Sequence, residues 1–432
     1  MNEDEKKQGM DFFVESRKVT SGAGKINYLQ RSKEISGEYM AKYIQDGWEA
    51  KRSGSNKICW VTVPVPLSLM YSFDIYIFQP ELDGAFAAYM GESVKWQMKA
   101  EKLDYSVDLC SYDRVNLGKS ISGAGEAENA LPPPDFLVTA RSNCNTYIHW
   151  WEMLARHYDI PLFVFDIPFW DRGLKDPIPK HYEEYWIKRS YDLINFLEQQ
   201  TGQKFDHDRY LENIGYELET RELWDAITKS SQMKPSPINE WDLLFPMLPI
   251  VWWRGRKDAV DIYKEVKKEI DERIAKGITA IPNEKYRLLF VSNPPWFRLD
   301  MLPQWLAEVD AVFVVSMVNR MFLDYTEVGV GNFEETMRGF AKQYLNYNIE
   351  NRIKWGEELI RDWSCDAMAL MDNRGCKIIA YPIPEMASEL ERRVGIPCLR
   401  FEGNMADPRD FNDEKVRAQF ENFVEMLEQR KG

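Results

Sequence analysis

The chain has 432 residues, a formal net charge of −14 and an apolar content of 44%. This length favours two or three domains, and this apolar content excludes a disordered protein. The acidic balance argues against a nucleic-acid backbone as the main partner, and no apolar run approaches the ~20 residues that a membrane-spanning helix needs.

The first segment, MNEDEKKQGMDFF, is charged and lacks the apolar stretch of an export signal. We therefore expect a cytoplasmic protein, in which thiols stay reduced. Cysteines in such a protein are more often buried, metal-binding or catalytic than disulfide-bonded. Residues 1–50 are expected to form a polar helical segment.

Two series of strands follow, separated by a helical stretch. The first comprises KICWVTVPVP (57–66), FDIYIFQPE (73–81), FLVTA (136–140) and LFVFDIP (162–168). Helical periodicity then dominates residues 179–285, where two helical segments end at Gly202 and Gly277. The second series comprises KYRLLFVSNPP (285–295), AVFVVSM (311–317), AMALMDN (367–373), KIIAYPIP (377–384) and PCLRFEG (397–403).

Strands that alternate with helices predict parallel sheets covered on both faces. The expected fold class is α/β, with two doubly wound domains, a helical N-terminal segment and a helical insert. The expected boundaries are 1–50 for the N-terminal segment, 51–178 for the first α/β domain, 179–285 for the insert and 286–432 for the second α/β domain.

The six cysteines divide by context. Cys59, Cys365 and Cys398 lie in or beside apolar strands, which favours small core side chains. The other three lie in polar turns: Cys110, Cys144 and Cys376. Any one of these three alone is most simply an ordinary loop cysteine.

Cys144 and Cys376 occupy the same topological place, because each follows a strand and precedes a helix, an "IP" and another strand. In open α/β sheets this place is the crevice beyond the carboxyl ends of the strands, where ligands bind. A helix start also favours a thiolate. We therefore expect a shared site.

The three thiols suit a 4Fe–4S cluster with one open iron. The sequence has no CxxC pair, which excludes a zinc ribbon or a ferredoxin-type run, and structural zinc usually takes four protein ligands. His149 and His157 follow Cys144 at helical spacing and are candidate ligands or proton donors, although ordinary surface or core histidines are the favoured interpretation.

At these residues the chain resembles the 2-hydroxyacyl-CoA dehydratase and benzoyl-CoA reductase family. The resemblance extends from about residue 55 to the C-terminus, and its most specific segments are DNRGCK and GIPCLRFEGNMADPRDF. CSYDRVNLG, SNCNTYIHWWE, YDIPLFVFDIP and SNPPW also carry it. The family resemblance implies two related subunits, each holding a 4Fe–4S cluster between α/β domains, with Cys110, Cys144 and Cys376 as the cluster ligands here.

Within the family, KPSPINEWDLLFP, WWRGRKDAVDIY and EKYRLLFVSNPPW most resemble the larger subunit of ATP-dependent benzoyl-CoA reductases. This resemblance implies that single low-potential electrons reach an aromatic acyl-CoA thioester, supplied by a separate ATP-hydrolysing activator protein. The chain itself has no GxxxxGK[ST] phosphate loop. Three alternatives stay open: a (R)-2-hydroxyacyl-CoA dehydratase subunit that works through a ketyl radical, a non-catalytic electron-relay subunit, and a metal-free binding module.

Weaker expectations concern the surroundings of these cysteines. Hydrogen bonds to cluster sulfurs and turn stabilisation are equally favoured for Ser142, Asn143, Asn145, Arg374 and Lys377. The NPPW segment either shapes a substrate wall or ends its strand.

Two further expectations lie outside these turns. Asp407 and Arg409 are expected to form a structural ion pair. The aromatic segment NEWDLLFPMLPIVWW (239–253) is expected to be an exposed surface for a homologous partner subunit, with an internal core helix as the alternative.

Overall fold

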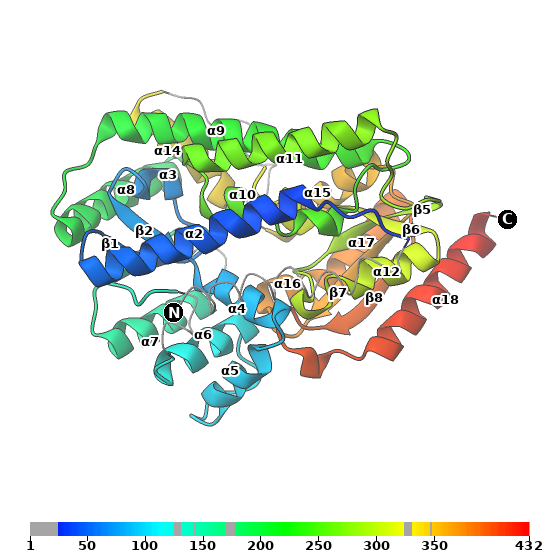
Figure 1. Ribbon diagram of the computed structural model, residues 1–432, viewed down its shortest axis with the longest axis horizontal. Helices are drawn as coiled ribbons and strands as arrows, with labels where there is room; N and C mark the ends of the chain where they lie inside the picture. The colour runs from blue at the N-terminus through cyan, green and yellow to red at the C-terminus, as the bar shows by residue number, and fades with distance from the viewer. Residues whose placement is uncertain are drawn as a thin grey trace.

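The computed structural model describes residues 25–124, 131–141, 144–168, 178–323, 331–345 and 348–431, with the side chains of 342–345 and 431 left aside. Two four-stranded parallel sheets organise the fold, as Figure 1 shows. The first has the order β2-β1-β3-β4 and the second has the order β6-β5-β7-β8. Both sheets therefore place their strands in the same order, which confirms the predicted α/β class with parallel sheets.

The strands of the first sheet are β1 (Lys57–Val61), β2 (Ile75–Phe78), β3 (Phe136–Ala140) and β4 (Leu162–Phe165). Those of the second are β5 (Tyr286–Val291), β6 (Ala311–Ser316), β7 (Ala367–Asn373) and β8 (Cys398–Gly403). Side chains alternate between the two faces, as they must along a strand. In β1, Ile58 and Trp60 enter one core and Cys59 and Val61 enter another.

Helices cover both faces of the first sheet. On the face of Trp60 lie α2 (Arg31–Ser53), α4 (Pro80–Tyr89), α6 (Ser111–Ile121) and α7 (Thr146–Tyr158), with α5 (Ser93–Glu101) beside them. On the opposite face lie α3 (Leu67–Met70), α8 (Lys180–Thr201), α9 (His207–Lys229) and α14 (Phe333–Leu345).

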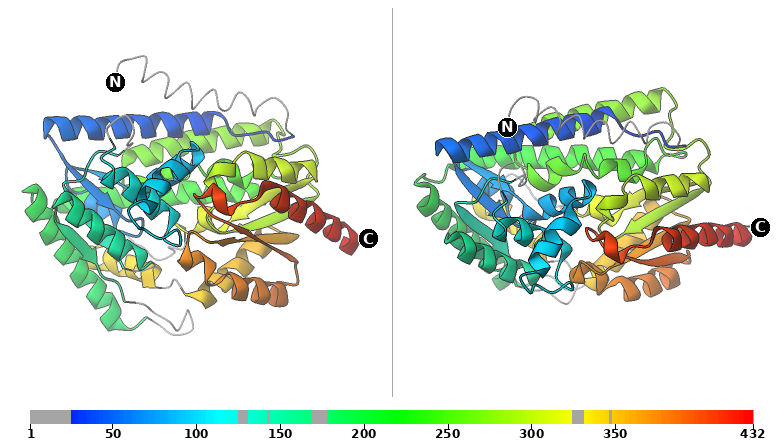
Figure 2. Two further views of the ribbon diagram at one scale, coloured as in Figure 1. Left: turned by 90° about the horizontal axis from the view of Figure 1, so that it is seen from below. Right: turned by 60° about the horizontal axis from the view of Figure 1, so that its bottom comes forward.

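The second sheet is covered in the same way. α12 (Met301–Glu308) and α18 (Asp413–Lys431) pack on one face, and α15 (Ile349–Asp362) and α17 (Ile383–Val394) pack on the other. The parts of the molecule built on the first and the second sheet are called its first and second halves. The second half also contains the shorter helices η4 (Trp296–Arg298), α13 (Met317–Arg320), α16 (Lys377–Ala380) and η5 (Pro408–Asp410). In Figure 2 the second sheet again lies at the end of the molecule that carries α18.

The helices of residues 179–285 do not stand apart from the sheets. α8 and α9 contribute Trp186 and Tyr210 to the core of the first sheet. α11 (Lys257–Ala275) lies along α2, where the backbone N–H of Ser32 donates to Glu269 Oε2 at 2.6 Å. α14 belongs in sequence to the second half but packs against the first sheet. The predicted domain boundaries stay a prediction.

The prediction of a strand at KIIAYPIP (377–384) is wrong. Residues 377–380 form α16, and α17 begins at Ile383. β8 pairs directly with β7, so no strand lies between them in the sheet. A short apolar run has the same composition in a buried helix as in a strand, and here Ile383 is fully buried as the first residue of α17.

The prediction that residues 239–253 form an exposed surface is also wrong, and the core alternative is confirmed. Every residue of the segment is buried. It contains η3 (Glu240–Leu243) and α10 (Leu248–Trp252), which follow η2 (Ser230–Gln232). Trp241 stacks on Phe313 of the second sheet, whereas Trp252 Nε1 donates to Ile77 O of the first at 2.6 Å. The aromatic side chains therefore join the two halves from within.

No helix in the described ranges is both long enough and apolar enough to cross a membrane.

Candidate functional site

The three cysteines of the polar turns lie at helix starts. Cys144 follows β3 and precedes α7, and Cys376 follows β7 as the N-cap of α16. β3 and β7 are equivalent strands in the two sheets, so these two cysteines occupy equivalent positions. Cys110 is the N-cap of α6 in the first half. All three are half-buried, and none forms a disulfide.

The three thiols influence one another electrostatically. Burial raises the pKa of Cys110 well above its ordinary value, and negative charge at Cys376 and Cys144 raises it further. Burial, then Cys144, raises the pKa of Cys376 to about 12. Each of the three pairs therefore lies within electrostatic range, and the structure brings Cys110, Cys144 and Cys376 together from both halves.

The turn before Cys376 touches the turn after Cys110. A Cβ atom added to Gly375 would lie 2.6 Å from Ser111 Oγ and 2.5 Å from Asn404 Oδ1. Distances this short leave no room for a side chain. Glycine at 375 therefore permits the close approach that sets Cys376 beside Cys110.

The donor set is chemically suited to a metal group. Three neighbouring thiols would repel one another as thiolates, and a bound cation would relieve that repulsion, because a coordinating thiol is deprotonated outright. Within the described residues, no group of three or more His, Cys, Asp or Glu side chains is placed to hold a single metal ion. A 4Fe–4S cluster would be held by Cys110, Cys144 and Cys376, each thiolate bound to one of its irons.

The remaining cysteines differ from these three. Cys59 and Cys365 are buried, and burial raises the pKa of both. Cys398 is half-buried at the start of β8 and packs against the core of the second sheet. These positions confirm the prediction that Cys59 and Cys365 are core side chains. Cys398 fits the same prediction less closely, because it is only half-buried.

The two histidines lie on the surface of α7. The side chain of His149 is 82% exposed and lies 3.7 Å from Glu152. His157 is also exposed, with its ring against Tyr158. The favoured interpretation of both as ordinary surface histidines is confirmed.

Polar neighbours of the cysteines have local partners. Arg374 pairs with Glu402 at 3.4 Å, and Lys377 Nζ donates to Arg374 O at 3.2 Å. Asn145 is the exposed N-cap of α7. The predictions for Ser142 and Asn143 lie outside the described residues. The described contacts support turn stabilisation for Arg374 and Lys377.

The NPPW segment ends its strand and also reaches the site. β5 ends at Val291, before both prolines. Trp296 is buried and its indole N–H donates to the Tyr112 hydroxyl. Tyr112 follows Cys110 by two residues; burial raises its pKa, and the charges of Cys110 and Cys376 raise it further. Trp296 therefore joins the second half to the Cys110 turn.

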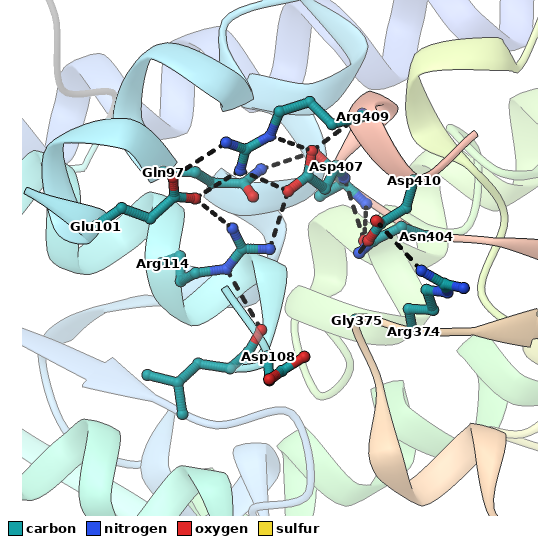
Figure 3. A network of polar contacts seen from close by, with 12 residues as sticks. Gln97, Glu101, Asp108, Arg114, Arg374, Gly375, Asn404, Asp407, Arg409 and Asp410 are labelled. Atoms are coloured by element: carbon teal, nitrogen blue, oxygen red, sulfur yellow. Dashed lines mark hydrogen bonds and ion pairs between the residues drawn. The ribbon is translucent and has the colours of Figure 1, made fainter. Parts of the chain in front are cut away.

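The predicted ion pair of Asp407 and Arg409 is confirmed, at 2.7 Å, and belongs to a larger network. Figure 3 shows Arg114 between Glu101 and Asp407, with Arg409 closing the ring. The network spans both halves, since Glu101 and Arg114 lie in the first and Asp407 and Arg409 lie in the second.

The sequence did not point to a buried acid next to Tyr147. Glu81 lies in the first turn of α4, just beyond β2. Its Oε1 accepts from the backbone N–H of Val63 at 3.0 Å. Burial raises its pKa to about 7, and the adjacent Tyr147 hydroxyl opposes that rise. The available signal was its place after a strand, in FDIYIFQPE.

Tyr147 connects Glu81 to the thiols. Burial raises its pKa well above the ordinary value, followed by the charges of Glu81, Cys144, Cys110 and Cys376. The hydroxyl therefore lies within electrostatic range of the acid and of all three sulfurs. An acid that holds a proton near neutral pH can act as a general acid.

Comparisons with known proteins find matches that cover most of the chain. A family model described as 2-hydroxyglutaryl-CoA dehydratase, D-component, matches residues 62–427. The chain is 28% identical to the (R)-2-hydroxyisocaproyl-CoA dehydratase alpha subunit of Clostridioides difficile, over 93% of this chain and 97% of that protein.

Two further relatives are similar over the same extent. Identity is 26% to the alpha subunit of (R)-2-hydroxyglutaryl-CoA dehydratase from Acidaminococcus fermentans, over 90% of this chain and 96% of that protein. Identity is 27% to the B subunit of benzoyl-CoA reductase from Thauera aromatica, over 96% of this chain and 98% of that protein.

Proposed function

The chain belongs to the family of the 2-hydroxyglutaryl-CoA dehydratase D-component, and from this premise we propose that it is the iron–sulfur subunit of a benzoyl-CoA reductase-type enzyme. The family resemblance inferred from the sequence is confirmed, whereas the reductase chemistry is our proposal. The observation that carries it is the grouping of Cys110, Cys144 and Cys376 from both halves of the molecule.

We assign these three cysteines as the ligands of a 4Fe–4S cluster. When bound, such a cluster supplies single electrons at low potential and an iron atom with an open position. The protein contributes three sulfurs, two of them at equivalent strand ends. The substrate is an acyl-CoA whose thioester carbonyl accepts the electron.

Aromatic side chains support an aromatic acyl group. Tyr112, Tyr147 and Trp296 surround the thiols or contact their neighbours. Aromatic rings stack with one another at offset or edge-to-face angles and gain about 0.5–1.5 kcal/mol beyond area burial. These residues suit a planar ring held near the sulfurs.

Glu81 is our candidate for the proton donor. Its pKa of about 7 keeps a substantial fraction of the carboxyl protonated at neutral pH. A general acid works best when its pKa lies near the operating pH. The adjacent Tyr147 supports this role, because its hydroxyl lies within electrostatic range of both Glu81 and the three thiols.

The subunit is proposed to work with partners. Its relatives are named as alpha or B subunits, which supports pairing with a homologous subunit. We further propose that an ATP-hydrolysing activator protein supplies the electrons. The sequence has no phosphate loop of its own with which to perform that hydrolysis.

A dehydratase subunit is the second candidate, favoured by the family model and by the dehydratase alpha subunits among the relatives. Electron stoichiometry separates the two. The purified complex is given activator, ATP, a reductant and either benzoyl-CoA or a 2-hydroxyacyl-CoA.

A reductase consumes two electrons for each benzoyl-CoA, with continuing ATP hydrolysis. A dehydratase turns over many times after one activation, because the electron returns once water is expelled. Inert benzoyl-CoA together with dehydration of a 2-hydroxyacyl-CoA on trace ATP would refute the reductase assignment.

A further inference from the structure

We propose that Arg114 is a positioning residue that fixes the separation of Cys110 and Cys376 across the two halves of the molecule. The separation of the thiols is a property of the protein alone. Only the identity of the group that the thiols hold rests on the proposed function.

Arg114 is anchored to the Cys110 turn. It lies in the first turn of α6, and its backbone N–H donates to Cys110 O at 3.0 Å. Its Nε donates to Leu109 O at 3.4 Å. The guanidinium therefore holds the backbone on the N-terminal side of Cys110, and the helix holds the other side.

The same guanidinium reaches the second half. Nη1 lies 2.7 Å from Glu101 Oε1, and Nη2 lies 3.0 Å from Asp407 Oδ2. The side chains of Arg114 and Asp407 are only 1% and 4% exposed, so water screens this pair little. A planar guanidinium has its N–H donors in fixed directions, so it sets both the distance and the angle of each carboxylate that it binds. A lysine ammonium sets no such angle.

Asp407 belongs to a loop that supports the Cys376 turn. Its backbone N–H donates to Asn404 Oδ1 at 3.1 Å, and that oxygen also accepts from Ala406 at 3.0 Å. The same Asn404 oxygen lies against Gly375. Asn373 Oδ1 accepts from the N–H groups of Gly375 and Met405, both at 3.2 Å.

The contacts thus form one continuous path. It runs from Cys110 through Arg114 to Asp407, then through Asn404 to Gly375 and Cys376. Figure 3 shows Arg114, Asp407 and Asn404, with Gly375 beside Asn404. Arg409 reinforces the path, because it pairs with both Glu101 and Asp407. The two arginines balance the two carboxylates, so the network carries no net charge.

The first test measures thiol separation without any cluster. Full-length apoprotein with Cys144→Ser is treated anaerobically with dibromobimane, and the Cys110–Cys376 cross-link is quantified by mass spectrometry. The Arg114→Met variant is expected to cross-link about tenfold more slowly, by analogy with losses at residues that support metal ligands. Asp407→Asn keeps the shape of the loop and should give a smaller loss, and Arg114→Lys should recover little.

Arg221→Met is the matched control. Arg221 is also buried, with a side chain 7% exposed, and pairs with Glu217 within α9. This variant measures the general cost of losing a buried arginine and should cross-link at the parent rate. Circular dichroism and thermal unfolding identify folded variants, and Asp407→Asn decides the test if Arg114→Met does not fold.

The second test measures iron per chain and the electron paramagnetic resonance spectrum after anaerobic reconstitution, with Cys144 intact. Arg114→Met should bind iron about 10–100-fold more weakly and alter the spectrum. Unchanged cross-linking in folded Arg114→Met or Asp407→Asn would overturn the inference, as would a parent protein that forms no Cys110–Cys376 cross-link. Slower cross-linking in a protein that never binds iron would instead support the positioning role and refute the proposed cluster.

Discussion

The two halves of the molecule share a strand order but use it differently. Each has a buried glutamate close to the end of an edge strand: Glu81 beyond β2, and Glu240 against Ser316 at the end of β6. Burial raises the pKa of both to about 7. A raised pKa alone therefore does not distinguish a functional acid from a structural one.

The surroundings of the two acids do distinguish them. One oxygen of Glu240 accepts from the Ser316 N–H at 3.0 Å, the Ser316 hydroxyl at 2.8 Å and the Asn319 amide at 2.8 Å. Glu81 instead accepts from the Val63 backbone N–H at 3.0 Å and lies beside Tyr147, whose hydroxyl is within electrostatic range of the three thiols. We therefore propose Glu81 of the first half as the acid of the site, whereas Glu240 holds β6 and α13 in the second half.

Substituting the two glutamates should have the largest contrasting effect. Glu81→Gln keeps the shape but removes the proton, and turnover should fall about 10²–10⁴-fold, the range for a lost general acid. Glu240→Gln keeps an oxygen that can accept the same hydrogen bonds and should leave turnover nearly unchanged. Steady-state turnover of both variants with equal iron content checks the contrast, and equal losses would contradict it.

The next contrast compares the effect on stability of replacing two glycines, Gly375 beside the cysteine turns and Gly215 within helix α9. Gly375→Ala places a Cβ within 2.6 Å of Ser111 and Asn404 side-chain atoms and should destabilise the protein by about 1–3 kcal/mol. Gly215→Ala, within α9, meets no atom within 4 Å and should stabilise it by about 0.5–1 kcal/mol. Urea unfolding of each variant measures the difference. A neutral Gly375→Ala would show that the two cysteine turns are not in close contact.

A smaller effect concerns pH. Burial raises the pKa of Glu81 from 4.5 to about 7, so the folded state holds this proton more tightly. The resulting stability is fully present below about pH 4.5 and is lost as pH rises through about 7. Relative to the parent protein, Glu81→Gln should therefore gain stability on the order of 2–3 kcal/mol between about pH 5 and about pH 8. Urea unfolding across that range tests this, and a difference independent of pH would refute it.

Most of the strands, the order of the elements and the three cysteines of the polar turns could be predicted from the sequence. Polar turns that follow buried strands are a local feature, so they are visible in the sequence alone. The sequence did not locate Glu81, whose role depends on Tyr147 from a distant helix. The aromatic segment 239–253 was misjudged because composition does not show which surface covers it; Trp241 and Trp252 are buried by opposite sheets. The packing of α14 against the first sheet likewise depends on contacts between residues far apart in the sequence, so the sequence pattern does not show it.

The most direct test of the central claim is the iron and acid-labile sulfide content of single cysteine variants, purified anaerobically. We expect about 4 iron atoms and about 4 sulfide ions per chain in the parent protein, as for one 4Fe–4S cluster. Cys110→Ser, Cys144→Ser and Cys376→Ser should each lose most of both, whereas Cys59→Ser, Cys365→Ser and Cys398→Ser should retain them. Full iron retention in Cys144→Ser or Cys376→Ser would contradict the assignment of the cluster to these three cysteines.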